Sequence, residues 1–189
     1  MKVRVPLMVQ DPLTARYQDP AIRAIEGFDI TREAFFLDGP ITRRVAVLDF
    51  DPETGALTPG ARFLPPERNR KLGWYARVNP RHDEWDIYSP EFIRISTFAT
   101  VLKTIYMFED PDALGRPLTW AFDAPQLLVV PRAGQWANAY YERASHSLQF
   151  FYFDAGDSER VYTGLSRDIV AHETGHAVLD GIAPDLYDA

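Results

Sequence analysis

Short apolar runs, separated by turn residues, occupy the first 78 positions of the chain. Such runs predict strands. They are Val3 to Val9, Ala34 to Leu37, Val45 to Leu48 and Trp74 to Val78. After the third run, Pro52 presets a turn and Gly55 can take a positive φ, so this segment predicts a hairpin over Asp49 to Leu57.

The first segment with helical spacing follows Ser89. This capping serine, followed by Pro90 and an acid, predicts a helix start, and Asp110-Pro111 predicts a stop, which gives a helix over residues 90–109. Its apolar side chains predict one broad buried face, made of Phe98, Val101, Leu102, Ile105 and Phe108. A face of this kind is typical of a helix that packs on a core.

Three further apolar runs precede the C-terminal part of the chain. They are Gln126 to Val130, Ala139 to Tyr141 and Leu148 to Phe153. The last two flank a polar loop over Glu142 to Ser147, so we expect them to pair as antiparallel strands.

The composition narrows the classes of function. The chain has 27 acidic and 20 basic residues and a formal charge of -7, which disfavours nucleic acid as a partner. It has no cysteine, so any metal must bind through His, Asp or Glu. No apolar run reaches the roughly 20 residues of a membrane span or forms a signal peptide. We therefore expect no membrane partner and a cytoplasmic location, with export by another route left open.

Residues 166–180 carry the most specific chemistry. Ser166 is a cap-type residue and Gly181 follows the last residue of the pattern, so both ends of a helix are marked. His172 and His176 are four positions apart. Their directions therefore differ by about 40°, and both rings can reach one ion from the same face of the helix.

Glu173 completes a His-Glu-x-x-His motif. It points about 100° away from His172, outside the ligand set but near a water on the metal, where it could act as a base. The alternative is a helix with two ordinary histidines, one of which caps the helix or hydrogen-bonds in the core. The metal interpretation is favoured because ionisable side chains on a largely apolar helix are costly to bury without a partner.

The surroundings of this motif resemble thermolysin-like metallopeptidases, the gluzincins. The segment Asp168 to Asp180 is similar to the central helix of that family, with an acid four residues before the first histidine and another four after the second. Upstream, Asn138-Ala139-Tyr140-Tyr141 is similar to the Asn-Ala-aromatic-aromatic edge strand of the family. The resemblance covers about residues 90–187 and implies a zinc-dependent metallopeptidase that hydrolyses peptide bonds with a zinc-activated water.

The resemblance also implies roles for individual residues. The Asn138 side chain would bind substrate, and the backbone groups of Ala139 and Tyr141 would pair with an extended peptide or protein segment. Tyr187, eleven residues after His176, would stabilise the developing oxyanion.

Calcium is a second candidate cofactor. Asp168 matches a family position that helps to hold structural calcium, although its place in the first turn also suits the helix dipole. The acidic loop over residues 154–159 could hold a cation, but loops of this kind are usually only solvated.

The third protein ligand of a catalytic zinc is not evident in the sequence. Asp180 lies about 12 Å along the helix axis from His172, too far for one ion to bind both. In the resembled family this ligand is a glutamate on the next helix, at a position that would fall past Ala189. We therefore expect an incomplete or truncated form whose activity is in question, and the alternative function is a non-catalytic zincin-like module that binds a peptide or protein.

Together these patterns predict an α+β fold like the N-terminal subdomain of a zincin. A mainly antiparallel sheet is expected to pack on the helix at 90–109 and on the His-Glu-x-x-His helix at 166–180. The β-rich region 1–88 and the zincin-like region 89–189 are expected to form one continuous folding unit without the C-terminal subdomain. The last helix would then leave an apolar face uncovered, for an oligomer or a partner chain to cover.

Overall fold

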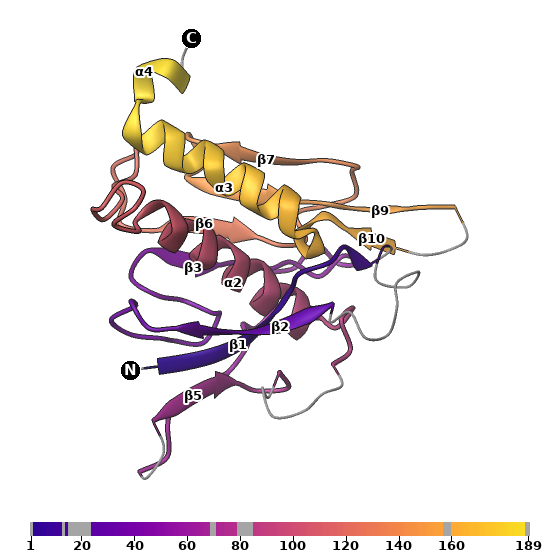
Figure 1. The fold of residues 1–189 in the computed structure, drawn as a ribbon. Coiled ribbons are helices and arrows are strands. Elements are labelled where there is room, and N and C mark those ends of the chain that lie inside the picture. Colours follow the sequence, from indigo (N-terminus) through magenta and orange to yellow (C-terminus); the bar gives the residue numbers. More distant parts are fainter. Residues whose placement is uncertain are drawn as a thin grey trace.

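The computed structural model describes residues 2–12, 14, 24–68, 71–78, 85–156 and 160–187. Over these residues the fold is α+β, with mixed sheets and three α-helices, of which two are long (Figure 1). No helix in these ranges combines the length and the apolar character that crossing a membrane requires.

The first sheet has the strand order β2-β1-β5-β4. Its centre is β1 (Lys2–Met8), which pairs antiparallel with β2 (Ile25–Ile30) and parallel with β5 (Leu72–Tyr75). The short strand β4 (Phe63–Leu64) pairs antiparallel with β5. Val3, Val5 and Leu7 of β1 are fully buried on one face of the sheet, and Pro6 and Met8 are buried as well.

The second sheet has the strand order β3-β6-β8-β7. Here β3 (Val45–Val47), β6 (Leu127–Val130) and β8 (Ser147–Phe150) run parallel, and β7 (Ala139–Glu142) is an antiparallel edge strand. The prediction that Ala139 to Tyr141 pairs antiparallel with the following run is therefore confirmed. Beyond β8 the chain forms a separate antiparallel pair, β9 (Tyr152–Asp154) with β10 (Arg160–Tyr162).

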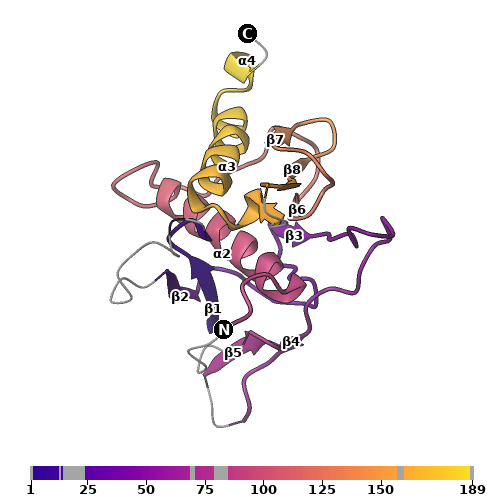
Figure 2. The ribbon, with the colours of Figure 1, turned by 90° about the vertical axis from the view of Figure 1, so that its right-hand side faces the viewer.

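The helix α2 (Pro90–Phe108) lies between two layers (Figure 2). Its start is as predicted, because the Ser89 Oγ accepts a hydrogen bond from Phe92 N at 3.3 Å and Pro90 occupies the first turn. However, more of the helix is buried than the one face that was predicted. The helix packs on β1 from one side and on α3 (Arg167–Ile182) from another, so it is buried around most of its circumference from Phe92 to Ile105.

The helix α3 follows the short 3₁₀ turn η1 (Thr163–Leu165) and precedes α4 (Pro184–Tyr187). It extends two residues beyond the predicted end at 180, so Gly181 lies inside the helix instead of ending it. Gly181 serves close packing: a Cβ at this position would overlap the carbonyl oxygen of Thr119 in the loop before β6. Ser166 occupies the N-cap position of α3, but its side chain makes no capping hydrogen bond.

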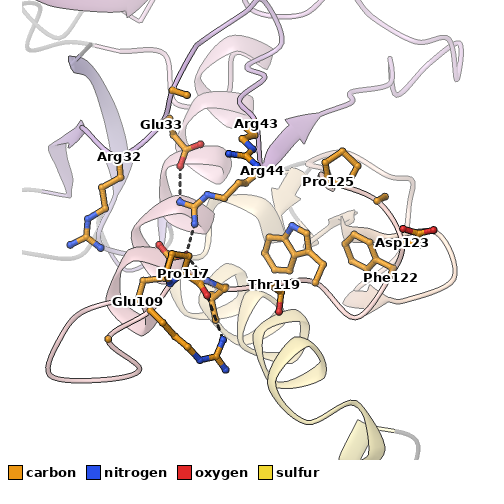
Figure 3. A pocket seen from close by; sticks show the side chains of 16 residues that line it. Arg32, Glu33, Arg43, Arg44, Glu109, Pro117, Thr119, Phe122, Asp123 and Pro125 are labelled. Carbon is orange, nitrogen blue, oxygen red and sulfur yellow. Dashed lines mark hydrogen bonds and ion pairs between the residues drawn. The ribbon is translucent and has the colours of Figure 1, made fainter.

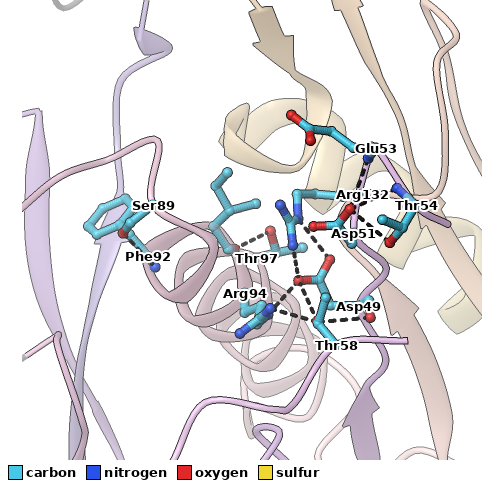
Figure 4. Close-up of polar contacts among 11 residues, drawn as sticks. Asp49, Asp51, Glu53, Thr54, Thr58, Ser89, Phe92, Arg94, Thr97 and Arg132 are labelled. Atoms are coloured by element: carbon cyan, nitrogen blue, oxygen red, sulfur yellow. Dashed lines mark hydrogen bonds and ion pairs between the residues drawn. The ribbon is translucent and has the colours of Figure 1, made fainter. Parts of the chain in front are cut away.

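A buried ionic cluster joins the second sheet to α2 (Figure 4). Asp49, just after β3, accepts hydrogen bonds from Arg94 of α2 and from Arg132, which follows β6. The Arg132 Nε to Asp49 Oδ1 distance is 2.9 Å and the Nη2 to Oδ2 distance is 2.6 Å. All three side chains are buried. Buried charges require such pairing. The cluster therefore links α2 to the segments that follow β3 and β6.

Several local predictions differ from the structure. The sheets are mixed: two of the three pairings are antiparallel in the first sheet, as predicted, whereas two of the three are parallel in the second. The run Ala34 to Leu37 forms no strand, because the chain turns back and leaves only an isolated bridge between Leu37 and Ile41. The strand expected at Trp74 to Val78 ends at Tyr75, where Arg77 takes a φ of 65° in a turn. The run expected at Leu148 to Phe153 is divided between β8 and β9.

The predicted hairpin over Asp49 to Leu57 is confirmed. Asp51 N donates to Ala56 O at 2.8 Å, and Gly55 has the expected positive φ, 67°. The hairpin follows β3, a strand of the N-terminal region that pairs directly with β6 of the later region. Buried side chains from both regions form one hydrophobic cluster.

Candidate metal centre

Two histidine rings converge on the outer face of α3. The Nε2 atoms of His172 and His176 lie 3.1 Å apart, and their ring planes are nearly perpendicular at 86°. Two imidazole nitrogens bound to one tetrahedral zinc ion at about 2.0–2.1 Å stand roughly 3.3 Å apart. The separation of the two histidine nitrogens is therefore close to that of two ligands on one tetrahedral ion.

The packing of α3 determines which way this pair faces. Val170, Thr174, Ala177 and Val178 are buried on the side that contacts α2 and the second sheet. The histidines occupy the other side of the helix, where His172 is exposed and His176 is half-buried. The pair is thus open to solvent along one face, as a metal site with an exchangeable position must be.

Glu173 faces the edge strand β7. Its side chain is almost buried, with 9% relative exposure, and its Oε2 accepts a hydrogen bond from Tyr141 N at 3.2 Å. The helix therefore directs the two histidines and this carboxylate toward different neighbours, as the angular spacing of the motif predicts. Glu173 thus contacts β7, and the histidine pair lies on the neighbouring face of the same helix.

The outer edge of β7 is the side that Glu173 approaches. Phe151 N donates to Asn138 O, which marks these two residues as a hydrogen-bonded pair of the antiparallel ladder. Because such pairs alternate along the strands, the backbone groups of Ala139 and Tyr141 point away from β8. The bond from Tyr141 N to Glu173 agrees with this direction. Asn138 is half-buried immediately before the strand.

A buried ion pair holds β7 against α3. Asp180 has 0% relative exposure and accepts hydrogen bonds from the Tyr141 hydroxyl at 2.6 Å, from Arg143 Nε at 2.8 Å and from Arg143 Nη2. Burial alone would raise the pKa of Asp180, but the bonds from Arg143 and Tyr141 outweigh it and lower this pKa below its ordinary value. Asp180 is thus a brace between the helix and the edge strand.

This brace is the part of the site that sequence reasoning missed. Arg143 lies in a polar loop with no motif around it, and its guanidinium also donates to the backbone carbonyl of Pro184 at 3.2 Å. The alternation of side chains along β7 could have indicated part of it. Tyr141 points toward α3, whereas Tyr140 points toward Phe151 and Gln149.

The remaining predicted ligands and site residues are only partly described. Within the described ranges, no group of three or more His, Asp or Glu lies close enough together to hold a metal ion. Tyr187 ends α4, and its side chain lies outside the described residues. Asp168 is exposed in the first turn of α3. In the acidic loop, Asp154 pairs with Arg160 at 3.5 Å, and residues 157–159 lie outside the described residues.

Four apolar side chains of α3 and α4 are partly exposed. The exposed fractions are 37% for Ile169, 44% for Leu179, 38% for Ile182 and 68% for Leu186. That an oligomer or a partner chain covers them stays a prediction. No family model, curated protein or solved structure matches this chain.

Proposed function

We propose that this chain belongs to a zinc-dependent peptidase of the thermolysin-like type, with a zincin-like arrangement of sheet and helix. The observation that carries the proposal is the placement of the His172 and His176 pair beside an antiparallel edge strand, with Glu173 between them and the strand. Each of these parts alone is common in proteins. Their combination provides metal ligands, a base and a peptide-binding edge within one site.

The residues divide the work of peptide hydrolysis. His172 and His176 would hold the metal through their imidazole nitrogens. When bound, zinc supplies Lewis acidity, which polarises a carbonyl and lowers the pKa of a water ligand. Glu173 accepts a proton from the attacking water, so its carboxylate must exchange the bond to Tyr141 N for one to that water. Tyr187 would donate a hydrogen bond to the oxyanion, as the family resemblance implies.

The edge strand orients the substrate. The backbone groups of Ala139 and Tyr141 point outward from β8, so an extended peptide can add to the sheet as a further strand. Asn138 stands at the start of this strand, where its amide can hold one end of the peptide. Strand addition of this kind fixes the direction of the substrate next to Glu173. It thereby lowers the entropy cost of reaching the transition state.

Replacement of the proposed base tests this function. Glu173→Gln should abolish hydrolysis of a mixed set of internally quenched peptides and leave zinc binding unchanged, because the change removes the proton acceptor and neither histidine. Glu142→Gln is the matched control, since Glu142 is exposed at the end of β7. Hydrolysis by the Glu173 variant at the wild-type rate would remove this residue from its proposed role.

A second candidate function is a non-catalytic module that binds a peptide or protein along β7 and uses zinc, if at all, for structure. It is favoured by the present engagement of Glu173, whose carboxylate is largely buried and bonded to Tyr141 N. The two functions differ in their need for metal. Peptide binding that persists with a chelator, without hydrolysis when zinc is restored, would support the second.

A further inference from the structure

A cavity of about 760 Å³ lies on a different part of the molecule from the histidine pair. Its walls come from three segments: residues 32–34 after β2, residues 43–44 before β3, and residues 115–125 between α2 and β6. Glu109, the C-cap residue of α2, also lines the cavity. The volume falls within the range of small-molecule sites, about 300–1,000 Å³.

The two buried acids of this cavity share one arginine. Arg44 donates to Glu33 at 2.7 Å and to Glu109, and the Tyr106 hydroxyl also donates to Glu33 at 3.2 Å. Glu109 accepts a further bond from Leu118 N at 2.8 Å. Figure 3 shows Arg44 between the two carboxylates. One guanidinium against two carboxylates leaves this cluster with a net charge of -1, and the whole lining, with four arginines and three acids, carries +1.

The exposed charges of the cavity are mainly positive. Arg32, Arg43 and Arg116 line it from separate segments and are all exposed, whereas Asp123 is its one exposed acid. No contact among the described residues engages the guanidinium of Arg43, and Arg116 makes only a long bond of 3.5 Å to Pro117 O. In a chain with a net charge of -7, this concentration of arginines favours an anionic ligand.

Aromatic rings form one wall of the cavity. Trp120 and Phe122 both line it and are stacked, with their centroids 5.9 Å apart and their planes within 10°. Phe122 is stacked in turn on His146, with centroids 4.4 Å apart and planes within 13°. The Trp120, Phe122 and His146 rings are thus held with nearly parallel faces. A flat apolar platform favours a planar ring in the ligand.

We propose that this cavity binds a small anion that carries an aromatic ring, of the chemical class of the nucleoside monophosphates. The ring stacks on the wall formed by Trp120 and Phe122, and the phosphate pairs with Arg43, whose forked guanidinium group suits phosphate oxygens. This site is independent of the proposed peptidase chemistry, because the cavity and the histidine pair share no residue.

Calorimetric titration of the whole chain with adenosine monophosphate tests this site. Adenosine and inorganic phosphate, titrated separately, supply the ring alone and the charge alone. We expect saturable binding of the monophosphate and at least about tenfold weaker binding of each part, since a hydrogen bond to a charged group and a stacked ring each contribute tenfold or more. Binding of phosphate as tight as that of the monophosphate, or no saturable binding at all, would overturn the proposal.

Two variants locate the binding in this cavity. Arg43→Ser should weaken binding of the monophosphate at least about tenfold while leaving the thermal unfolding temperature unchanged, because Arg43 is exposed. Trp120→Leu should weaken binding of the monophosphate and of adenosine alike. Arg62→Ser, an exposed arginine outside the cavity, is the control and should bind as the wild type does. Wild-type affinity in the Arg43 variant would place any binding elsewhere and overturn the proposal.

Discussion

Asp180→Asn removes the charge that fixes β7 to α3 and keeps the shape of the side chain. The wild-type carboxylate accepts bonds from Arg143 Nε at 2.8 Å, from Arg143 Nη2 and from the Tyr141 hydroxyl at 2.6 Å. The asparagine oxygen can still accept from one donor. Its amide group, however, faces the guanidinium as a second donor, so part of the pairing is lost.

The structure sets the expected loss of stability. Hydrogen bonds to charged groups contribute about 1.5–3 kcal/mol each, and breaking a fully buried ion pair costs about 3–5 kcal/mol. Arg143 keeps 28% of its side chain exposed, so water can solvate it in part once its partner is neutral. We therefore expect the free energy of unfolding to fall by about 2–3 kcal/mol, less than for a fully buried pair.

Urea unfolding at pH 7 measures this change, with Asp168→Asn as the matched control. Asp168 is an exposed acid on the same helix, and its interaction with the helix dipole contributes only about 0.3–1 kcal/mol. Equal losses in the two variants would refute the assignment of Asp180 as a buried brace.

The pH dependence gives a second, independent check. Because the pKa of Asp180 is lowered in the folded protein, its stabilising effect is fully present above the unfolded value of about 3.9. That effect is lost as the pH falls toward the folded pKa. The difference in stability between the wild type and Asp180→Asn should therefore shrink below about pH 4, and a difference that stays constant down to pH 2 would contradict the pairing.

Three further substitutions test the packing of α3 and the buried ionic cluster by the same unfolding assay. Gly181→Ala should lower the free energy of unfolding by about 1–3 kcal/mol, because its Cβ would overlap Thr119 O, whereas Gly175→Ala should raise stability by about 0.5–1 kcal/mol, since the space there is open. Stabilisation by both would contradict the close approach at Gly181. Asp49→Asn should cost about 3–5 kcal/mol, because it leaves two buried arginines without their anion. A loss below about 1 kcal/mol would mean that water or another group neutralises the cluster.

Elements with local signals could be predicted from the sequence. The start of α2 depends on Ser89 and Pro90, and the hairpin after β3 depends on Gly55, so each is determined by neighbouring residues. The strand β2 has no such signal, because Glu26, Gly27 and Asp29 interrupt its apolar pattern. It forms through pairing with β1, which a local pattern does not contain.

The same distinction applies to the candidate sites. The convergence of His172 and His176 follows from a spacing of four on one helix and was predictable. The bonds of Asp180 with Arg143 join residues 37 positions apart in the chain. The cavity lined by Arg43 and Trp120 depends on the tertiary arrangement of separate segments, so neither feature leaves a periodic trace in the sequence.

The number of zinc ions per chain is the most direct test of the proposed metal centre. Metal analysis of protein purified without added zinc, with His172→Ala as the control, should give close to one zinc per wild-type chain and a much lower value for the variant. That result requires a third ligand from the polypeptide or its oligomer, together with the two histidines. Wild-type protein without tightly bound metal, or a variant with the same zinc content, would contradict the assignment of this pair as metal ligands.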